Sequence, residues 1–473
     1  MKTPLPALLF AGVAAAVFAA EPPADPIIAV RAPVVALTHA RVIDGRGHAA
    51  LENQTLILRD GKIAALGADA DVKIPDGATV RDLTGKSVLP GLVMVHEHLY
   101  YSSIAGGPFH LNEMEFSFPR LYLAAGVTSA RTTGSIEPYT DLEMKARIAD
   151  GRSFGPKLFL TAPYFDGPET GLAQLHAVAD VPSAVRMVNY WADEGFTSVK
   201  VYINLPQDLM AAVIATAHQR HLQVTGHIGK VSYREAAGLG IDNLEHGFMA
   251  MSDLNKNRKP GDASNARNNY AALESLDLAA PGINDLIKLL VDRRVALTST
   301  LAIFETFTPG RRVASAAELA TLAAPLRESY LTTWSAINLQ NNPVMKSAFA
   351  KNMLLEAKFF RAGGLLVVGT DPTGYGGCLA GYGNWRALEL LVEAGLTPLE
   401  TIQVATFNGA TLLGVAKETG SVEAGKAADL IVVNGDPSKN ISDLRKTEIV
   451  FKDGTGYDSE KLFASVKGLV GIQ

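Results

Sequence analysis

The stretch Pro90-Gly91-Leu92-Val93-Met94-Val95-His96-Glu97-His98 decides the fold. Its apolar residues have the pattern of a β-strand, and that strand leads into two histidines separated by one residue. Residues i and i+2 of a strand point to the same side, so both imidazoles could bind one metal ion. Structural histidines are common, however, and this pair alone leaves a purely structural role open.

Around this strand, residues 89–420 alternate short apolar runs with helical patterns, for example at 181–194, 207–220 and 284–293. Such alternation is typical of βα units with a parallel sheet. Eight units fit an α/β fold, a (β/α)8 TIM barrel with insertions. The expected strands cover residues 93–98, 127–131, 157–161, 198–202, 223–227, 242–246, 296–299 and 365–371.

Two long connections interrupt the predicted barrel, at residues 248–283 and 300–364. The first is rich in Asn, Asp, Lys and Gly, and we expect an exposed loop there. The second carries helical patterns, for example over residues 316–339. Long insertions after barrel strands are usually lids, so both segments are predicted to be lids.

Both ends of the chain are rich in β-strand patterns. Near the N-terminus these patterns cover residues 34–43, 54–59 and 62–66, and near the C-terminus they cover 430–433 and 448–452. Asp60-Gly61 marks a hairpin turn between two of these strands. The pattern predicts one small β domain assembled from both termini, residues 21–88 and 421–473, around a barrel over residues 89–420.

Composition excludes several classes of protein. The chain has 473 residues, of which 48% are hydrophobic and 19% charged, so it is not a disordered chain. The net charge is −5, without the basic stripe of a nucleic-acid-binding protein. Cys378 is the one cysteine, which excludes an intrachain disulfide framework and a zinc site made of several cysteines.

The first 20 residues have the pattern of a secretory signal peptide. Lys2 precedes a short apolar run over residues 5–18, and Val17-Phe18-Ala19 fits a cleavage site. A membrane anchor or a buried helix is the alternative, but the run is shorter than the roughly 20 residues that span a bilayer. We expect an exported protein, periplasmic or secreted, without an integral membrane segment after cleavage.

Further metal-binding side chains follow the other predicted strands. His227, His246 and Asp371 end three of these strands, and Lys200 lies inside a fourth that is otherwise apolar. The carboxyl ends of barrel strands converge on one mouth, where catalysis occurs. Together with the first histidine pair, these residues predict a metal centre at that mouth.

Lys200 has three possible explanations, because a lysine in a buried strand is costly unless it is paired or neutralised. It could extend its amine to solvent, form a Schiff base, or react with carbon dioxide to give a carbamate that bridges two metals. Two divalent ions bring four positive charges, and Asp371, a carbamate and a bridging hydroxide each remove one. An uncarboxylated Lys200 would instead be repelled by the metals, so the charge balance favours the carbamate. The N/O ligand set suits Zn, with Mn, Co or Ni as alternatives.

In this order, His96, His98, Lys200, His227, His246 and Asp371 resemble the amidohydrolase superfamily with a binuclear metal site. The segments Asn408-Gly409-Ala410 and 420–430 are similar to the closing segments of its imidazolonepropionase-like and Xaa-dipeptidase (prolidase-like) branch. The usual Asp before the first histidine is missing here. The resemblance also implies that true imidazolonepropionases lack the bridging lysine, so Lys200 argues against that activity.

The resemblance implies the roles of the ligands. His96 and His98 would hold the more buried metal with Asp371, whereas His227 and His246 would hold the more exposed one, and carboxylated Lys200 would bridge them. The metals would supply a bridging hydroxide, and Asp371 would act as general base and then as general acid.

Candidate substrate contacts have weaker support, since each could equally be a structural residue. Tyr202 lies two residues beyond Lys200 and therefore on the same face of the strand. Arg131 ends the second strand and could bind a substrate carboxylate or pair with an acid. Tyr100, Tyr101 and His110 follow the first strand in a predicted loop.

We therefore expect a metal-dependent hydrolase that cleaves an amide (C–N) bond of a small molecule, such as a dipeptide or an N-acyl amino acid. A lactone, a cyclic amide or an aryl amide such as a toxin is the alternative substrate for the same site. A non-catalytic binding protein would be expected to have lost a metal ligand. The expected partners are a small-molecule substrate and a possible second copy of the chain, with no nucleic acid.

Overall fold

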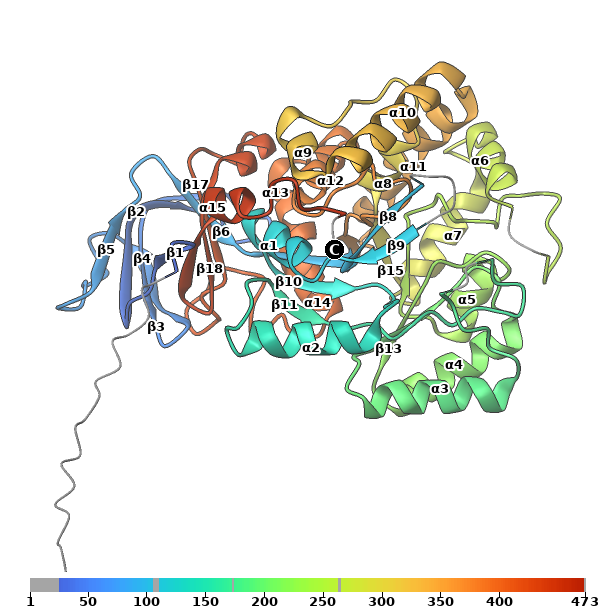
Figure 1. The fold of residues 1–473 in the computed structure, drawn as a ribbon, viewed down its shortest axis with the longest axis horizontal. Helices are drawn as coiled ribbons and strands as arrows, with labels where there is room; N and C mark the ends of the chain where they lie inside the picture. Colours follow the sequence, from blue (N-terminus) through green and yellow to red (C-terminus); the bar gives the residue numbers. More distant parts are fainter. Residues whose placement is uncertain (1–24, 105–109, 172–173, 263–264, 472–473) are drawn as a thin grey trace, which may run out of the picture.

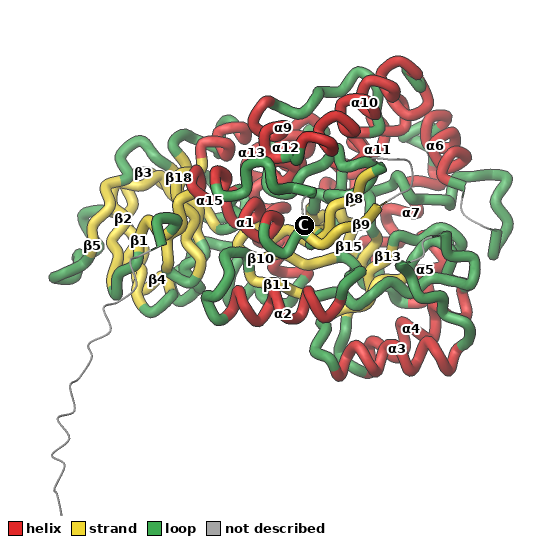
Figure 2. Tube along the Cα trace, in the orientation of Figure 1, coloured by secondary structure: helices red, strands yellow, loops and turns green. Residues whose placement is uncertain are grey.

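The computed structural model describes residues 25–104, 110–171, 174–262 and 265–471 (Figure 1). The predicted signal peptide, residues 1–20, lies outside the described residues. Among the helices of the described ranges, none is long and apolar enough to cross a membrane. Strands gather at one end of the molecule, and helices surround the other (Figure 2).

A nine-stranded sheet forms the strand-rich end, and both ends of the chain contribute to it. Its strand order is β1-β19-β18-β17-β6-β2-β3-β4, with β5 paired to β2. The apolar side chains Leu56, Val88, Leu430 and Phe451 are fully buried in its core. The strands are β1 (Ile28–Val30), β2 (Val34–Val42), β3 (Leu51–Arg59), β4 (Lys62–Ala68), β5 (Thr79–Asp82), β6 (Ser87–Pro90), β17 (Leu430–Val433), β18 (Thr447–Lys452) and β19 (Thr455–Asp458).

The hairpin between β3 and β4 shows why the sequence folds in this way. Asp60 and Gly61 both have positive φ, 51° and 73°, as the central residues of a type I′ turn require. The turn pairs Arg59 with Lys62 and continues the antiparallel register along both strands. The predicted hairpin is therefore present.

Eight parallel strands form the second part, in sheets of three and five strands. The strands are β7 (Leu92–Glu97), β10 (Val127–Thr132), β11 (Lys157–Phe159), β12 (Ser198–Val201), β13 (Gln223–Gly226), β14 (Asn243–Leu244), β15 (Ala296–Ser299) and β16 (Leu366–Val368). A bridge between Thr161 and Ser198 joins the two sheets on one side. On the other side the amides of Thr370 and Asp371 donate to the carbonyl of His96. The α/β class is confirmed, and most strands are shorter than predicted.

Helices connect these strands and cover them (Figure 1). The predicted helices at 181–194, 207–220 and 284–293 correspond to α3 (Val181–Asp193), α4 (Gln207–Gln219) and α7 (Pro281–Asp292). Helix α7 begins earlier than predicted, because Pro281 suits the first helical turn. The other connecting helices are α1 (Ser117–Ala124), α2 (Pro138–Ala149), α5 (Tyr233–Leu239), α12 (Tyr382–Glu393), α13 (Pro398–Gln403) and α14 (Gly409–Leu412).

The first predicted lid differs from the expectation. Residues 248–283 were expected to be an exposed loop, but they contain helix α6 (Ala266–Ser275), which packs against α11 (Pro343–Arg361). The side chain of Asn265 caps this helix by accepting from the amide of Asn268. Asparagine has low helix propensity, which hides such a helix in the sequence.

The second predicted lid is helical, as expected, but the helix predicted over 316–339 is divided. It consists of α9 (Ala316–Thr321) and α10 (Ala324–Gln340), and α8 (Leu301–Thr306) precedes them. The division falls at Leu322, which forms a bridge with Val470 near the end of the chain.

Two further elements were not predicted. Strands β8 (Tyr100–Ser103) and β9 (His110–Glu113) pair antiparallel where a loop was expected. Near the C-terminus, α15 (Ser459–Ala464) packs against α1, and the hydroxyl of Ser459 donates to the carbonyl of Ala124. The division of the chain into a barrel and a β domain at residues 88 and 421 stays a prediction.

Candidate metal centre and substrate cavity

One cavity of about 250 Å³ lies at the carboxyl ends of the parallel strands. Five of the six predicted ligands line it: His98 after β7, Lys200 on β12, His227 after β13, His246 after β14 and Asp371 after β16. The sixth, His96, lies directly beneath them and is fully buried. The fold thus brings together side chains that are far apart in the sequence.

The Asp371 carboxylate lies at the centre of the group. Its Oδ1 is 3.4 Å from Nε2 of His98 and 3.7 Å from Nε2 of His96. Its Oδ2 is 3.7 Å from Nδ1 of His246. One potential ligand atom each from His96, His98 and Asp371 lies within 4.8 Å of the other two, so these three side chains could hold one metal ion.

The remaining two histidines lie beside this trio. The ring centroids of His227 and His246 are 4.2 Å apart, and those of His96 and His246 are 4.8 Å apart. Burial lowers the pKa of His98 to about 4 and that of His227 to about 3. Both rings are therefore neutral near pH 7 and keep a lone pair for a metal ion.

Unpartnered nitrogens test whether these residues fit a metal. Nε2 of His96, Nδ1 of His98 and Nε2 of His246 are buried and have no hydrogen-bond partner among the described residues. Buried polar atoms are nearly always satisfied, so three such atoms in neighbouring imidazoles require an explanation, and Nε2 of His96 also lies 3.7 Å from the Asp371 carboxylate. Imidazole nitrogen and carboxylate oxygen are preferred zinc ligands, and the residues fit a divalent metal ion.

Glu245 fixes the orientation of His96, and the sequence analysis did not single it out. Its Oε2 lies 2.6 Å from Nδ1 of His96, and neither side chain is exposed. Burial raises the pKa of Glu245, but His96 and Arg131 outweigh this effect and hold it well below its usual range. The carboxylate therefore accepts from Nδ1–H and leaves Nε2 of His96 free for a metal.

Arg131 occupies a different place from the one expected for a substrate contact. Its guanidinium donates to Oε1 of Glu245 and Oδ1 of Asn243, each at 2.8 Å, and to the carbonyl of Val95 at 2.8 Å. Only 1% of its surface is exposed. Of the two roles predicted for Arg131, the structure thus shows the pairing with an acid, which lies beneath the metal ligands.

Lys200 is buried in the wall of the cavity. Its Nζ donates to the carbonyl of Thr133 at 3.0 Å and lies 5.0 Å from the ring centroid of Tyr164. Burial lowers the pKa of Lys200 to about 8, although Glu245 and Asp371 oppose this shift. A larger fraction of the amine is therefore neutral near pH 7, and the neutral form is the one that reacts with carbon dioxide.

Of the four predicted tyrosine and histidine contacts, two line the cavity and two lie elsewhere. Tyr100 and Tyr202 line the cavity, and the hydroxyl of Tyr100 hydrogen-bonds that of Tyr164 at 2.7 Å. Tyr101 is buried in the hydrophobic core and donates to the carbonyl of Gly376. His110 is exposed on β9. The latter two do not belong to the described lining.

Apolar side chains complete the cavity, and no periodic pattern identifies them in the sequence. They come from connections after several different strands and from the two predicted lids. The members are Leu111, Ile136, Leu175, Tyr270, Ile303, Phe304 and Phe307.

Two metal-binding candidates have an unusual backbone. His246 and Asp371 have positive φ, 71° and 52°, a region that residues other than glycine rarely adopt. The next residue, Gly247, also has positive φ, and a Cβ there would lie 2.0 Å from Oε1 of Glu356. Such backbone strain is often found at functional sites, where the surrounding structure maintains it.

Known proteins share this sequence and fold. A model of the amidohydrolase family matches residues 87–456. S-triazine hydrolase from Gordonia rubripertincta is 23% identical over 324 residues, which span 67% of this chain and 60% of that enzyme. Imidazolonepropionase from Porphyromonas gingivalis is 23% identical over 408 residues, 84% of this chain and 86% of that enzyme.

The solved structure of a Xaa-Pro dipeptidase with bound methionine has the same fold. It superposes with a TM-score of 0.67 at 20% identity and covers 90% of this chain and 100% of that one. The family match covers most of the chain, including the eight parallel strands and every predicted ligand described above. The chain therefore belongs to the amidohydrolase family, with an α/β fold of the TIM-barrel type, and it is an enzyme that hydrolyses C–N bonds.

Proposed function

We propose that this enzyme hydrolyses an amide bond of a small molecule with two divalent metal ions, which we assign as zinc, and a carboxylated Lys200. One observation carries the proposal: His96, His98 and His246 surround Asp371 beside a buried lysine, and each of the three imidazoles has one buried nitrogen without a hydrogen-bond partner among the described residues. A structural cluster would satisfy these nitrogens internally.

In this proposal His96, His98 and Asp371 hold one metal, His227 and His246 hold the other, and the Lys200 carbamate joins the two. When bound, the metals supply Lewis acidity, which makes water nucleophilic at neutral pH and polarises the scissile carbonyl. The remaining chemistry falls to side chains of this chain.

Asp371 has the position for proton transfer. It takes a proton from the attacking water and returns it to the leaving nitrogen. The hydroxyl of Thr373 donates to Oδ1 of Asp371 at 2.8 Å, which supports the orientation of the carboxylate. Tyr100 and Tyr202 orient the substrate from the cavity wall. Burial raises the pKa of Tyr202 above its usual range, so its hydroxyl remains a neutral hydrogen-bond donor.

Replacing Lys200 with Ala tests the binuclear site. The purified variant, supplied with bicarbonate and zinc, should bind fewer than two metals per chain and lose about 100-fold or more of the amidase activity. Elemental analysis measures the metal, and Lys288→Ala, at a lysine whose side chain is 73% exposed, is the control. Full activity with two bound metals in Lys200→Ala would refute the proposal.

Hydrolysis of a lactone, a cyclic amide or an aryl amide is the second candidate. The aromatic and aliphatic side chains of the cavity favour it, because they suit a ring better than a charged dipeptide. Initial rates on a panel of dipeptides, N-acyl amino acids, lactones and anilides separate the two candidates.

We also propose that the enzyme works after export and that its eight parallel strands close into a complete barrel beside a separate β domain. The signal-like pattern of residues 1–20 supports export, and the absence of a cysteine pair is compatible with it. N-terminal sequencing of protein from the periplasm or the medium tests this, and a mature chain that still begins at Met1 would contradict it.

A further inference from the structure

Part of the cavity wall is apolar. Six side chains from separate connections form this wall, and none of them carries a charge. We call them the apolar wall: Leu111, Ile136, Leu175, Ile303, Phe304 and Phe307. At about 250 Å³ the cavity lies below the range of roughly 300–1,000 Å³ that is typical of ligand pockets, so the substrate is small.

Cationic side chains are missing where a substrate carboxylate would need them. Among the described residues that line the cavity, Lys200 carries the only lysine or arginine side chain. Arg131, the candidate for this role, is engaged by Glu245 and Asn243 beneath the ligands. The sequences of residues 105–109, 172–173 and 263–264 contain no charged residue either.

Lys200 does not supply a positive charge for a substrate carboxylate. The inference rests here on the proposed function, in which Lys200 is a carbamate and carries a negative charge. A substrate carboxylate would then meet that carbamate, apolar side chains or the neutral hydroxyls of Tyr100 and Tyr202, but no lysine or arginine of the described lining, unless it occupied the metals themselves. Burying an ionised carboxylate without a partner is strongly unfavourable.

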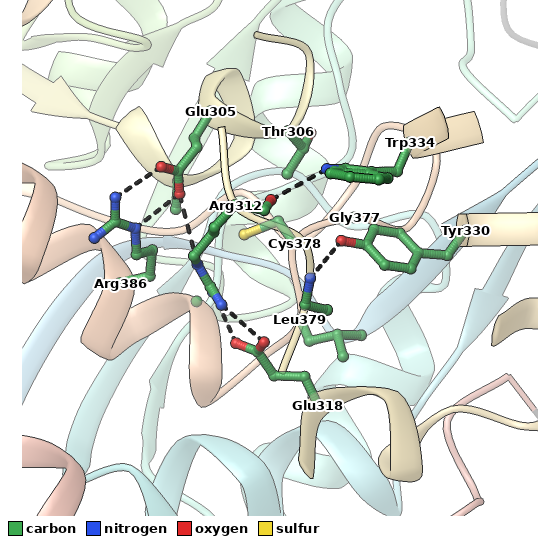
Figure 3. Close-up of a pocket in the computed structure, with 13 residues that line it drawn as sticks. Glu305, Thr306, Arg312, Glu318, Tyr330, Trp334, Gly377, Cys378, Leu379 and Arg386 are labelled. Atoms are coloured by element: carbon green, nitrogen blue, oxygen red, sulfur yellow. Dashed lines mark hydrogen bonds and ion pairs between the residues drawn. The ribbon is translucent and has the colours of Figure 1, made fainter. Parts of the chain in front are cut away.

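Ion pairs of Glu305 support helix α8, which carries part of the apolar wall; Figure 3 shows the pairs with Arg386 and Arg312. Helix α8 carries Ile303 and Phe304 on the cavity. The next residue on α8, Glu305, accepts two hydrogen bonds from Arg386, at 2.7 and 2.8 Å, and one from Arg311 at 2.9 Å. These bonds oppose a withdrawal of α8 that would let water solvate a charged group in the cavity.

We propose that the substrate is a small, uncharged amide with an aromatic or branched apolar group, and that the enzyme discriminates against substrates with a free carboxylate. In the reaction the C–N bond breaks, a C–O bond forms with the oxygen of water, and a water proton passes to the leaving nitrogen. The products are a carboxylic acid and an uncharged or protonated amine.

A matched pair of anilides tests the proposal. N-hexanoylaniline and 4-(hexanoylamino)benzoate have the same scissile bond and differ by one ring carboxylate. The zinc-loaded full chain should hydrolyse the neutral anilide with a kcat/KM about 100-fold higher, because the carboxylate would be buried without a partner. Equal rates, or a preference for the carboxylate, would overturn the inference while leaving amide hydrolysis intact.

A gain-of-function variant sharpens the test. Ile136→Arg places a cation on the apolar wall. It should reduce the ratio of kcat/KM between the neutral and the charged anilide about 10-fold. Ile136→Gln is the neutral control and should leave the ratio unchanged. Leu111→Arg, at a half-buried position of the same wall, serves if Ile136→Arg does not fold. An unchanged ratio in the folded Arg variants would contradict a role for the apolar wall in charge selection.

Failure of the proposed function would look different. If the enzyme binds two zinc ions but hydrolyses neither anilide nor any other amide, the proposed function is wrong. Binding of the two anilides, measured by isothermal titration calorimetry, then decides the inference by itself. Tighter binding of the neutral anilide would support selection against charge, and equal or tighter binding of the carboxylate would refute it.

Discussion

Two groups of charged residues in this enzyme have opposite properties. The metal centre contains three histidines around Asp371, each with one buried nitrogen that has no hydrogen-bond partner among the described residues. The Arg–Glu cluster, formed by Glu305, Arg312, Glu318 and Arg386, has every charged group paired (Figure 3). Arg312 makes two hydrogen bonds to Glu318, at 2.8 and 2.9 Å, and Arg386 makes two to Glu305.

The comparison distinguishes a site that can bind a ligand from a cluster that stabilises the fold. Both groups border a cavity, but the one beside the Arg–Glu cluster measures only about 30 Å³, against 250 Å³ at the metal centre. Trp334 donates to the carbonyl of Arg312 and joins α10 to the cluster. A cluster whose charged groups are all paired connects the elements that carry them. A cluster with unpartnered nitrogens can instead bind a ligand.

The largest effect is expected at the unsatisfied group. Asp371→Asn removes the central charge and the proton acceptor, so kcat/KM on an amide substrate should fall about 1,000-fold or more. Asp242→Asn is the control, because Asp242 lies before β14 at the opposite end of the parallel strands, where its carboxylate accepts from the amide of Val224. A fall of less than about 10-fold for Asp371→Asn would show that Asp371 does not take part in proton transfer.

The satisfied cluster should respond in stability instead. Glu305→Ala removes the buried acid that Arg386 and Arg311 share and leaves them paired only with Glu389 and Glu393, so the free energy of unfolding should fall by about 3 kcal/mol. Urea unfolding measures this loss. Glu143→Ala, at an acid whose side chain is 57% exposed, should cost less than about 1 kcal/mol. If the folded Glu305→Ala variant lost its zinc but none of its stability, the distinction between the two groups would fail.

Glu356 represents a third case, a buried acid without a cation among its hydrogen-bond partners described here. It accepts from Asn352 at 2.8 Å, and burial raises its pKa to about 7. In the unfolded chain it releases its proton near pH 4.5. The folded state thus binds more protons between these values, so the free energy of unfolding falls as pH rises, by up to about 3 kcal/mol.

Glu356→Gln should remove this part of the pH dependence. Urea unfolding of the variant and the natural protein at about pH 5 and about pH 8.5 gives the comparison, because all other titrating groups are shared. The natural protein should lose more stability at the higher pH than the variant does. The same pH dependence in both proteins would show that Glu356 is ionised in the folded state.

The smallest effect is expected one layer below the metal ligands. Glu245→Gln removes the negative charge that orients His96, and zinc affinity should fall about 10- to 100-fold. Competition with a chelator measures the affinity, and Glu143→Gln serves as the control. An unchanged affinity would mean that the His96 tautomer does not depend on Glu245.

The sequence predicts the metal ligands better than the residues that orient them. Lys200 stands out because it interrupts an apolar strand, and the histidines because they follow one. Glu245 is equally buried, but its role depends on Arg131, 114 residues away, and on His96, 149 residues away. Local patterns cannot reveal such long-range contacts, and for the same reason Arg131 was assigned two possible roles.

Strand lengths and the cavity wall were also difficult to predict. Residues 242–246 have the composition of a strand, yet β14 ends at Leu244 because His246 turns into positive φ. The apolar wall comes from connections without periodicity, in which Ile136 and Phe304 look like ordinary core residues. Only the folding of several connections over one mouth gives these residues a shared surface.

The position of β6 has a consequence for the synthesis of the protein. This strand pairs with β2 on one side and with β17 on the other, and Gly91 alone separates it from β7. The N-terminal half of the nine-stranded sheet therefore presents an open edge until β17 emerges from the ribosome. At roughly 5–20 residues per second, that interval lasts about 20–70 seconds. Completion of this sheet is thus a late event in the synthesis of the chain.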